Sequence, residues 1–143
     1  MASRTYKAKR KNWRELPREK WWVEGAIFEG KENSYIITNV KVTDEWEDSE
    51  IGADVIGYLV DPETICQDTG LTDKDGRKIF EGDILSAHLD DKHPEDITYV
   101  QITWDGFSWC MKESTEDDVM SEYDCNTFEV CGNIFDNPEL IGE

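Results

Sequence analysis

The sequence lacks most of the features that mark an enzyme or a cofactor-binding protein. It contains neither GxGxxG nor GxxxxGK[ST], the loops that cradle phosphates, and it has no nucleophile elbow. None of the four cysteines forms a CxxC pair, and neither histidine stands at zinc-finger distance from them. No apolar run approaches the roughly 18 residues of a membrane span, and no leader is recognisable. We therefore expect a non-enzymatic protein of the cytoplasm with free thiols and without a metal or cofactor.

Positive charge is also scarce, and it is unevenly placed. The chain has 15 Lys and Arg against 33 Asp and Glu, a net charge of −18. Residues 1–20 hold eight of these cations and only two acids, a net of +6, so the remaining residues carry −24. An acidic body repels nucleic acid and anionic membranes, so we expect neither as a direct partner. The same surface can imitate nucleic acid toward a basic protein.

What the sequence does contain is a series of short apolar or β-branched runs separated by turn signals. Such runs, with few helical windows, predict a mainly β protein. We expect strands within these segments: 21–28, 34–42, 54–60, 71–80, 84–85, 97–104, 107–111 and 127–135. The spacing of the turns indicates a small SH3-like β-barrel or sandwich of short antiparallel strands with one or two short helices. We interpret residues 1–143 as a single domain with a basic arm at 1–20.

Several segments are less regular. Glu24 and Gly25 predict a bulge or turn, and the basic arm predicts either a flexible tail or an edge strand. Residues 43–54 predict an exposed loop or one acidic helical turn, and 113–124 predict a short helix or loop. Asp61 before Pro62 predicts the capped start of a helical turn.

The clearest local signal is the hairpin within residues 69–85. Gly76 after Asp75 supplies the positive φ that a tight hairpin turn requires, and a second turn follows at 81–83. An EF-hand calcium loop is excluded, because Leu71 and Gly82 stand where that loop needs acids. The acids of this segment are therefore predicted to shape turns.

Three groups of residues are candidates for binding. Aromatic residues flank the Asp105-Gly106 turn and predict a stacking platform, a core contact or a subunit interface: Trp104, Phe107 and Trp109. Cations of the arm predict contacts with phosphate or with a neighbouring subunit: Lys9, Arg10, Lys11 and Arg14. Acids predict a partner-binding face: Asp44, Glu45, Glu47, Asp48, Glu50, Glu116, Asp117 and Asp118. His88 and His93 share an acidic loop that we interpret as solvated rather than metal-binding.

Two long motifs resemble the YopX-like family of phage and prophage proteins. They are VDPETICQDTGLTDKDGRKIFEGDIL at 60–85 and CGNIFDNPELI at 131–141, and the opening YKAKRKN…WWVEGAIFEG is also similar. Departures are Asp68, where the family often has an aromatic residue, and an insertion-like ELPRE at 15–19. The resemblance implies a small β-barrel-like fold, frequent self-association and a phage or mobile-element origin. It implies no catalytic residue.

The leading hypothesis is a phage- or prophage-encoded accessory protein that acts by binding in the host cytoplasm. In one form it is a counter-defence inhibitor whose acidic surface blocks a basic site on a host protein. In a second form it is a homo-oligomer that sequesters a nucleotide-like signalling molecule. Its basic arm would then contact the phosphates, and its tryptophans would stack on the base. A metal-dependent hydrolase that uses the acidic clusters is a third hypothesis.

Overall fold

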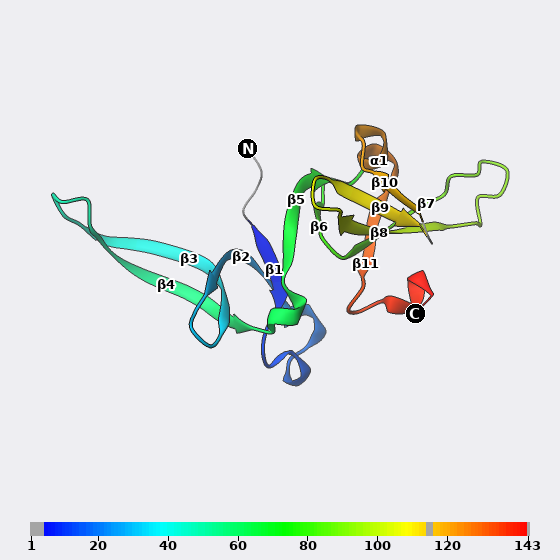
Figure 1. Cartoon of the computed structure of the whole chain (residues 1–143). Helices are drawn as coiled ribbons and strands as arrows, with labels where there is room; N and C mark the ends of the chain where they lie inside the picture. The colour runs from blue at the N-terminus through cyan, green and yellow to red at the C-terminus, as the bar shows by residue number, and fades with distance from the viewer. Residues whose placement is uncertain (1–4, 114–115, 143) are drawn as a thin grey trace. The chain divides into compact units, whose positions relative to one another are not determined.

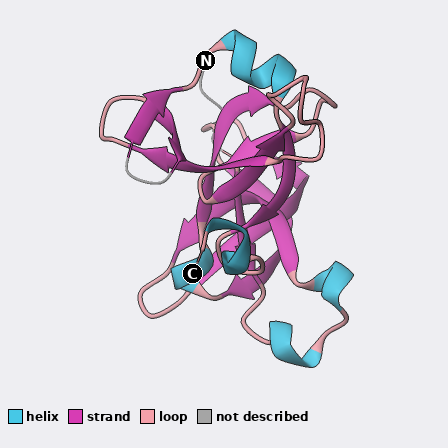
Figure 2. Ribbon diagram, turned by 90° about the vertical axis from the view of Figure 1, so that its right-hand side faces the viewer, coloured by secondary structure: helices cyan, strands magenta, loops and turns pink. Residues whose placement is uncertain are grey.

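A computed structural model describes residues 5–113 and 116–142. Strands dominate it, all the strand pairs are antiparallel, and the helical segments are short (Figure 2). This confirms the predicted mainly β fold class. The chain divides into two compact units, residues 5–67 and 68–142. Among the described residues, no helix has both the length and the apolar content needed to cross a bilayer.

The first unit is a sheet with strand order β4-β3-β2-β1-β5. Its elements are β1 (Tyr6–Lys9), the 3-10 turns η1 (Trp13–Glu15) and η2 (Arg18–Lys20), β2 (Trp22–Glu29), β3 (Ser34–Glu45), β4 (Ile51–Val60), η3 (Pro62–Thr64) and the start of β5 (Cys66–Thr72). β2 pairs with β3 only as far as Ile37, so the outer parts of β3 and β4 continue as a two-stranded arm (Figure 1).

A small core holds this sheet together. Ala8, Ile36 and Val60 are buried, and Tyr6, Val23 and Ile65 pack against them. Close packing explains Gly25, where a Cβ would lie 2.0 Å from the carbonyl oxygen of Ile37. β2 therefore runs through Gly25 without interruption, and the predicted bulge or turn at Glu24 and Gly25 is wrong.

Two further expectations for this unit need correction. The basic segment is neither a tail nor an edge strand over Tyr6–Lys9, because β1 pairs with β2 on one side and β5 on the other. Most of 43–54 is strand rather than loop or helical turn, since β3 reaches Glu45 and β4 begins at Ile51. Cross-strand pairing of β-branched residues extends the hairpin into this acidic segment. By contrast, Asp61 caps η3 as predicted, accepting a hydrogen bond from the Glu63 N–H.

The second unit contains a five-stranded sheet of order β10-β9-β8-β7-β11. Its elements are β6 (Lys78–Phe80), which pairs with β5, then β7 (Asp83–Ala87), β8 (Thr98–Trp104), β9 (Trp109–Glu113), β10 (Glu116–Val119), α1 (Glu122–Thr127), β11 (Glu129–Asn133) and η4 (Pro138–Ile141). The strand predicted at 97–104 and its turn at Asp105-Gly106 are confirmed, with φ of 102° at Gly106.

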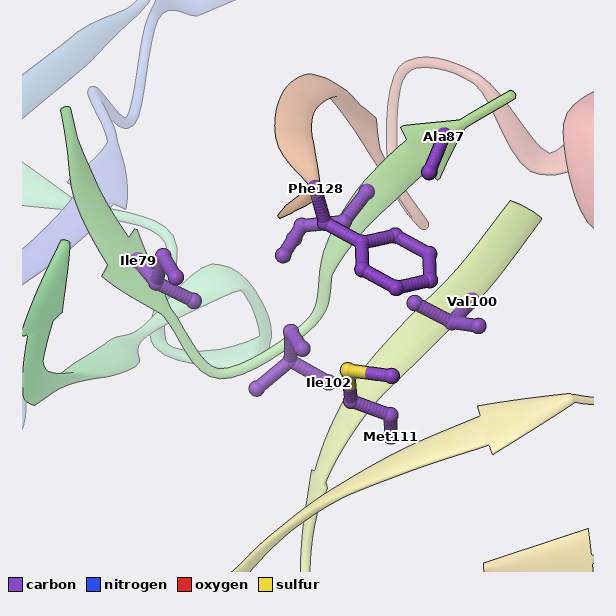
Figure 3. Packing of buried hydrophobic residues seen from close by; sticks show 7 residues of the cluster. Ile79, Ala87, Val100, Ile102, Met111 and Phe128 are labelled. Carbon is purple, nitrogen blue, oxygen red and sulfur yellow. The ribbon is translucent and has the colours of Figure 1, made fainter. Parts of the chain in front are cut away.

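The core of the second unit includes alternate residues of β8. Val100 and Ile102 point inward, and they pack with Ile79, Met111 and Phe128 (Figure 3). All five side chains are almost completely buried. Burial of such apolar side chains is the main stabilising contribution to this unit, at about 1.5–3 kcal/mol for each large one.

The segment 113–124 is more ordered than expected. A strand, β10, pairs antiparallel with β9, and the helix α1 begins only at Glu122. Ser121 and Asp124 form a capping box, which explains where the helix starts. The prediction of a short helix is therefore correct in kind, but the strand at 116–119 was not predicted.

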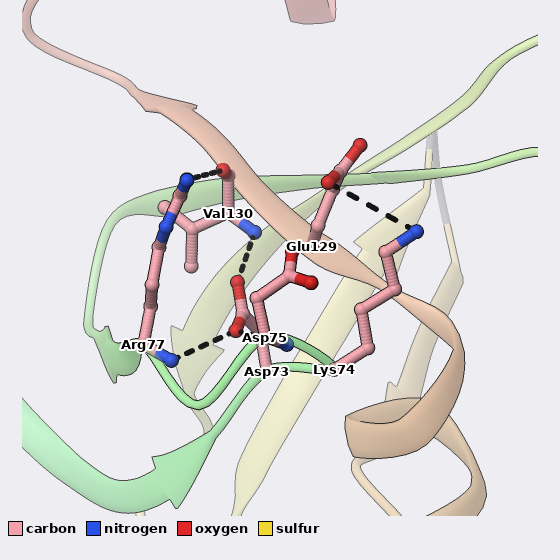
Figure 4. A network of polar contacts seen from close by, with 6 residues as sticks. All are labelled: Asp73, Lys74, Asp75, Arg77, Glu129 and Val130. Atoms are coloured by element: carbon pink, nitrogen blue, oxygen red, sulfur yellow. Dashed lines mark hydrogen bonds and ion pairs between the residues drawn. The ribbon is translucent and has the colours of Figure 1, made fainter.

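The Asp75-Gly76 hairpin is confirmed, and Asp73 organises it. Asp73 Oδ1 accepts hydrogen bonds from the Asp75 and Arg77 N–H groups at 2.9 Å each, and Oδ2 accepts one from Val130 N–H at 2.8 Å (Figure 4). Gly76 has a φ of 81°, as the turn requires. Burial alone would raise the pKa of the Asp73 carboxyl, but these N–H groups and the Arg77 guanidinium lower it below its ordinary value. Asp73 thus ties the hairpin to β11 and serves structure.

Candidate interaction surface

One face of the β3–β4 arm is apolar and exposed. The register pairs Val40 with Val55 and Val42 with Ala53, and these four side chains lie on the same face because alternate residues share a face. Toward the root of the arm the same face continues through the Tyr35–Leu59 pair to Phe28. Val40 is 53% exposed and Val55 55% exposed. We call the large exposed apolar side chains of this face the apolar face: Phe28, Val40, Val42, Val55 and Leu59.

The opposite face of the arm is more polar, although it carries one exposed isoleucine, Ile56. There Lys41 pairs with Asp54, and Asn39 pairs with Ile56. Closer to the root this second face carries Ile36 and Val60, which belong to the buried core. The arm is therefore amphipathic, with its apolar side uncovered in the described chain. An exposed apolar patch with a polar rim is typical of a site for protein–protein interaction.

The tip of the arm gathers five of the eight acids predicted as a partner-binding face. The turn closes with a hydrogen bond of 2.9 Å from Trp46 N–H to the Glu50 carbonyl, and Ser49 adopts a positive φ of 72°. Trp46 lies close to Gly52 and remains half exposed. We call this set the acidic tip: Asp44, Glu45, Glu47, Asp48 and Glu50. Glu116, Asp117 and Asp118 lie in β10 of the other unit, and their side chains are outside the described part.

Lys9 is the most unusual of the predicted cationic residues. It is only 3% exposed, and its Nζ lies 3.8 Å from the ring centroid of Trp13, 4.7 Å from Trp21 and 5.7 Å from Trp22. Stacking of an ammonium on aromatic faces offsets part of its desolvation. The backbone N–H of Lys9 also donates to Thr64 Oγ1 at 2.8 Å. This lysine therefore lies inside a cage formed by the protein's own tryptophans.

The neighbouring cations also contact aromatic rings of their own unit. The Arg10 guanidinium lies 4.5 Å from the Tyr58 ring and that of Arg14 lies 4.4 Å from Trp13. Lys11 is exposed, and its N–H donates to the Leu59 carbonyl at 2.9 Å. Lys11 and the bridge between Arg10 and Val60 place both cations beside the root end of β4. Their predicted role toward phosphate or a neighbouring subunit stays a prediction.

The three predicted aromatics gather at the β8–β9 turn. Trp104 and Trp109 form a cross-strand pair with ring centroids 4.8 Å apart, and Phe107 at the turn is 92% exposed. Asp105 closes this turn by accepting hydrogen bonds from the N–H groups of Phe107 and Ser108, which lower the pKa of its carboxyl. The structure thus brings the aromatics together, in a different unit from the cations.

The loop with both histidines contains the only potential metal-ligand group in the described chain. His93, Glu95 and Asp96 lie close together but are all exposed. His88 instead contacts the Pro94 carbonyl through Nδ1. Exposed groups of this kind are common without an ion, so these three residues alone do not indicate a metal site.

Reasoning from the sequence missed the apolar face and the lysine cage. The signals were present, since SYIITNVKV and DVIGYLV were both assigned to strands. Placing Val40 and Val55 on one uncovered face requires the register, which is set by two bulges in β3. The cage depends on the chain path through η1 and η2, which propensity does not specify.

A family model described as YopX protein matches residues 16–142, which include the whole of the β3–β4 arm. The crystal structure of protein EF1440 from Enterococcus faecalis is similar, with a TM-score of 0.62, 26% sequence identity, and 96% of each chain covered. The comparison with curated proteins gave no match.

Proposed function

The chain belongs to the family of YopX proteins, as its central motifs predict, and from this premise we propose that it is a non-enzymatic accessory protein that acts by binding. Its binding element is the β3–β4 arm, and its target is a host protein with a basic site next to an apolar surface. In this proposal the chain is encoded by a phage or prophage. It inhibits a host defence protein in the host cytoplasm by occupying that basic site.

The observation that carries the proposal is the combination of charge and apolar area on one arm. Five carboxylates lie within seven residues at the tip, and the apolar face follows directly along the strands. Carboxylates steer a protein toward a basic site and select it, whereas apolar side chains supply most of the affinity once water is excluded. An arm with both properties suits occlusion of a channel that normally holds a nucleic acid backbone.

Sequestration of a nucleotide-like molecule is the second candidate function. The aromatic turn of Trp104, Phe107 and Trp109 supports it, because exposed rings can stack on a base. It also needs cations that meet phosphates, and Lys9, the first of the predicted cations, is buried among rings of its own unit. For this reason we place inhibition through the arm first.

The test compares two variants with equal loss of charge. The tip variant replaces Asp44, Glu45, Glu47, Asp48 and Glu50 by their amides, and the control variant replaces Asp75, Asp90, Asp91, Glu95 and Asp96 in the other unit. Host proteins retained by the wild type are identified by mass spectrometry, and the affinity of the purified partner is then measured by calorimetry. We expect the tip variant to bind about tenfold more weakly, and the control to stay within about twofold of the wild type.

The salt dependence of the affinity is an independent test. Because charge interactions between exposed groups are largely screened at 1 M NaCl, where the Debye length is about 3 Å, we expect the affinity of the wild type to fall. Equal affinity of the tip variant and the wild type would contradict the proposal. So would a complex whose affinity is the same at low salt and in 1 M NaCl.

A further inference from the structure

We propose that the outer edge of β4 pairs antiparallel with β4 of a second copy of this chain, which joins two arms into a four-stranded ribbon. This self-association through a defined strand edge does not depend on the host partner proposed above. β4 is the terminal strand of its sheet. In the described chain, the edge of β4 that faces away from β3 pairs with no strand from Ile51 to Tyr58.

The composition of β4 leaves this edge unprotected. Strand edges that stay single usually carry lysine, proline or a bulge, which discourage pairing with another chain. β4 has neither lysine nor proline, Asp54 is its one charged residue, and the bulges of this hairpin lie in β3. In addition, two-stranded ribbons are marginally stable in water, and the outer arm is such a ribbon. A third and a fourth strand would stabilise it.

The outward backbone groups of β4 can be assigned from two hydrogen bonds. The Ile56 carbonyl faces β3, where it accepts a hydrogen bond from Thr38 Oγ1, whereas the Leu59 carbonyl faces outward to Lys11 N–H. Because N–H and C=O of alternate residues point to opposite edges, those of Ala53, Val55 and Gly57 face outward. These are the groups that a second strand would engage.

Charge selects both the orientation and the register. Arg10 and Lys11 occupy the edge beside Leu59 and Val60, and the acidic tip lies at the opposite end of β4. An antiparallel pair therefore brings the acidic tip of each copy to Arg10 and Lys11 of the other. Five carboxylates face two cations at each end, so each end of the dimer remains acidic.

Within that orientation, one register fits best. Pairing centred on Asp54 would oppose two carboxylates, which is destabilising. Pairing centred on Ile56 could extend over only a few residues, because Arg10 and Lys11 already occupy the edge beside Leu59 and Val60. Pairing centred on Val55 opposes Asp54 to Ile56 and uses residues 52–58 of both copies. It also joins the apolar faces of the two arms side by side through the Val40–Val55 pairs.

The experiment uses two lysine substitutions with equal exposure on the same face. Val55→Lys places two like charges next to each other at the centre of the proposed pair, whereas Val40→Lys lies on the inner strand β3 and leaves the edge unchanged. Masses are measured by sedimentation velocity and light scattering at about 100 μM, with circular dichroism to verify folding. We expect the wild type and Val40→Lys to have twice the 16.6 kDa chain mass, and Val55→Lys to be monomeric.

Two other outcomes overturn the proposal. A monomeric wild type would show that the edge stays single at this concentration. Loss of the dimer in both variants would instead indicate packing of the apolar faces against each other. Cysteine variants test the register: oxidation should cross-link Val55→Cys at least about fivefold more than Val40→Cys or the wild type, because only residue 55 lies opposite itself. Equal cross-linking of the three proteins would contradict the register.

Discussion

Asp73 shows how a residue that resembles a metal ligand in the sequence can be explained by the fold alone. Its two carboxylate oxygens accept three backbone hydrogen bonds, two within the turn and one from Val130, 57 residues away. The carboxylate therefore joins the hairpin to β11. Such a network is satisfied by an ionised side chain and by no other group of the same shape.

We predict that Asp73→Asn lowers the free energy of unfolding by about 1.5–3 kcal/mol at pH 7, the range for hydrogen bonds to a charged group. The amide keeps one acceptor oxygen but turns an NH₂ group toward the turn or toward Val130. Urea unfolding measures the change. Asp75→Asn is the matched control, because Asp75 is exposed in the same turn and contributes its backbone N–H to the network. It should shift the value by less than about 0.5 kcal/mol.

The same variant has a predictable dependence on pH. The folded state holds the pKa of Asp73 below its ordinary value of 3.8, so the unfolded chain binds the proton more tightly. The stabilisation is therefore complete above the unfolded pKa and is lost as the pH falls through the lower, folded one. We expect the gap between the wild type and Asp73→Asn to narrow below about pH 4. A gap that is constant from pH 7 to about pH 2.5 would show that the charge is irrelevant.

Lys9 marks the limit of prediction for single residues. Its sequence context predicts an exposed cation, and the structure buries it among three indole rings. Lysine has a strong preference for solvent, which tertiary contacts override here. No local pattern reports that Trp13, Trp21 and Trp22 converge on one ammonium group.

At the scale of the element, the turns were predicted better than the strand lengths. Asp75-Gly76 and Asp105-Gly106 are recognisable because a tight turn needs a positive φ, which is a local requirement. The outer part of the β3–β4 arm was mistaken for a loop because its acids disfavour strands, whereas pairing with the facing strand stabilises them. For the same reason the acidic tip was predicted but the apolar face was not.

Gly25 is the position where β2 depends most on the absence of a side chain. A Cβ there would lie 2.0 Å from the carbonyl oxygen of Ile37, which is backbone and cannot rotate away. We predict that Gly25→Ala lowers the free energy of unfolding by about 1–3 kcal/mol, as overpacking does. Gly52→Ala is the control. A Cβ there would lie 3.1 Å from Asp44 Oδ2 and 3.3 Å from Thr43 Oγ1, which are side-chain atoms that can move. Equal losses in the two variants, measured by thermal unfolding, would mean that backbone contact is not the cause.

At the scale of the whole molecule, charge is the dominant property. A net charge of −18 on 143 residues gives a surface on which acids outnumber cations. Lys9 and Arg14, which lie against the ring of Trp13, do not neutralise this excess. This excess favours solubility and fast encounter with basic partners, but it destabilises the compact state through self-repulsion. The same charge that makes the arm a candidate ligand for a basic site therefore has a cost in stability.

We predict that raising NaCl from about 20 mM to about 500 mM stabilises the protein, because screening weakens repulsion among acids more than it weakens the few exposed ion pairs. A gain of about 1 kcal/mol corresponds to a rise of roughly 4 °C in the unfolding midpoint for a chain of this size. The variant with amides at Asp75, Asp90, Asp91, Glu95 and Asp96 should gain less, since it starts with less repulsion.

Calorimetry at matched protein concentration measures both proteins, and the edge variant Val55→Lys separates this effect from any change in self-association. A midpoint that falls with salt in Val55→Lys would show that attractive charge contacts outweigh the repulsion.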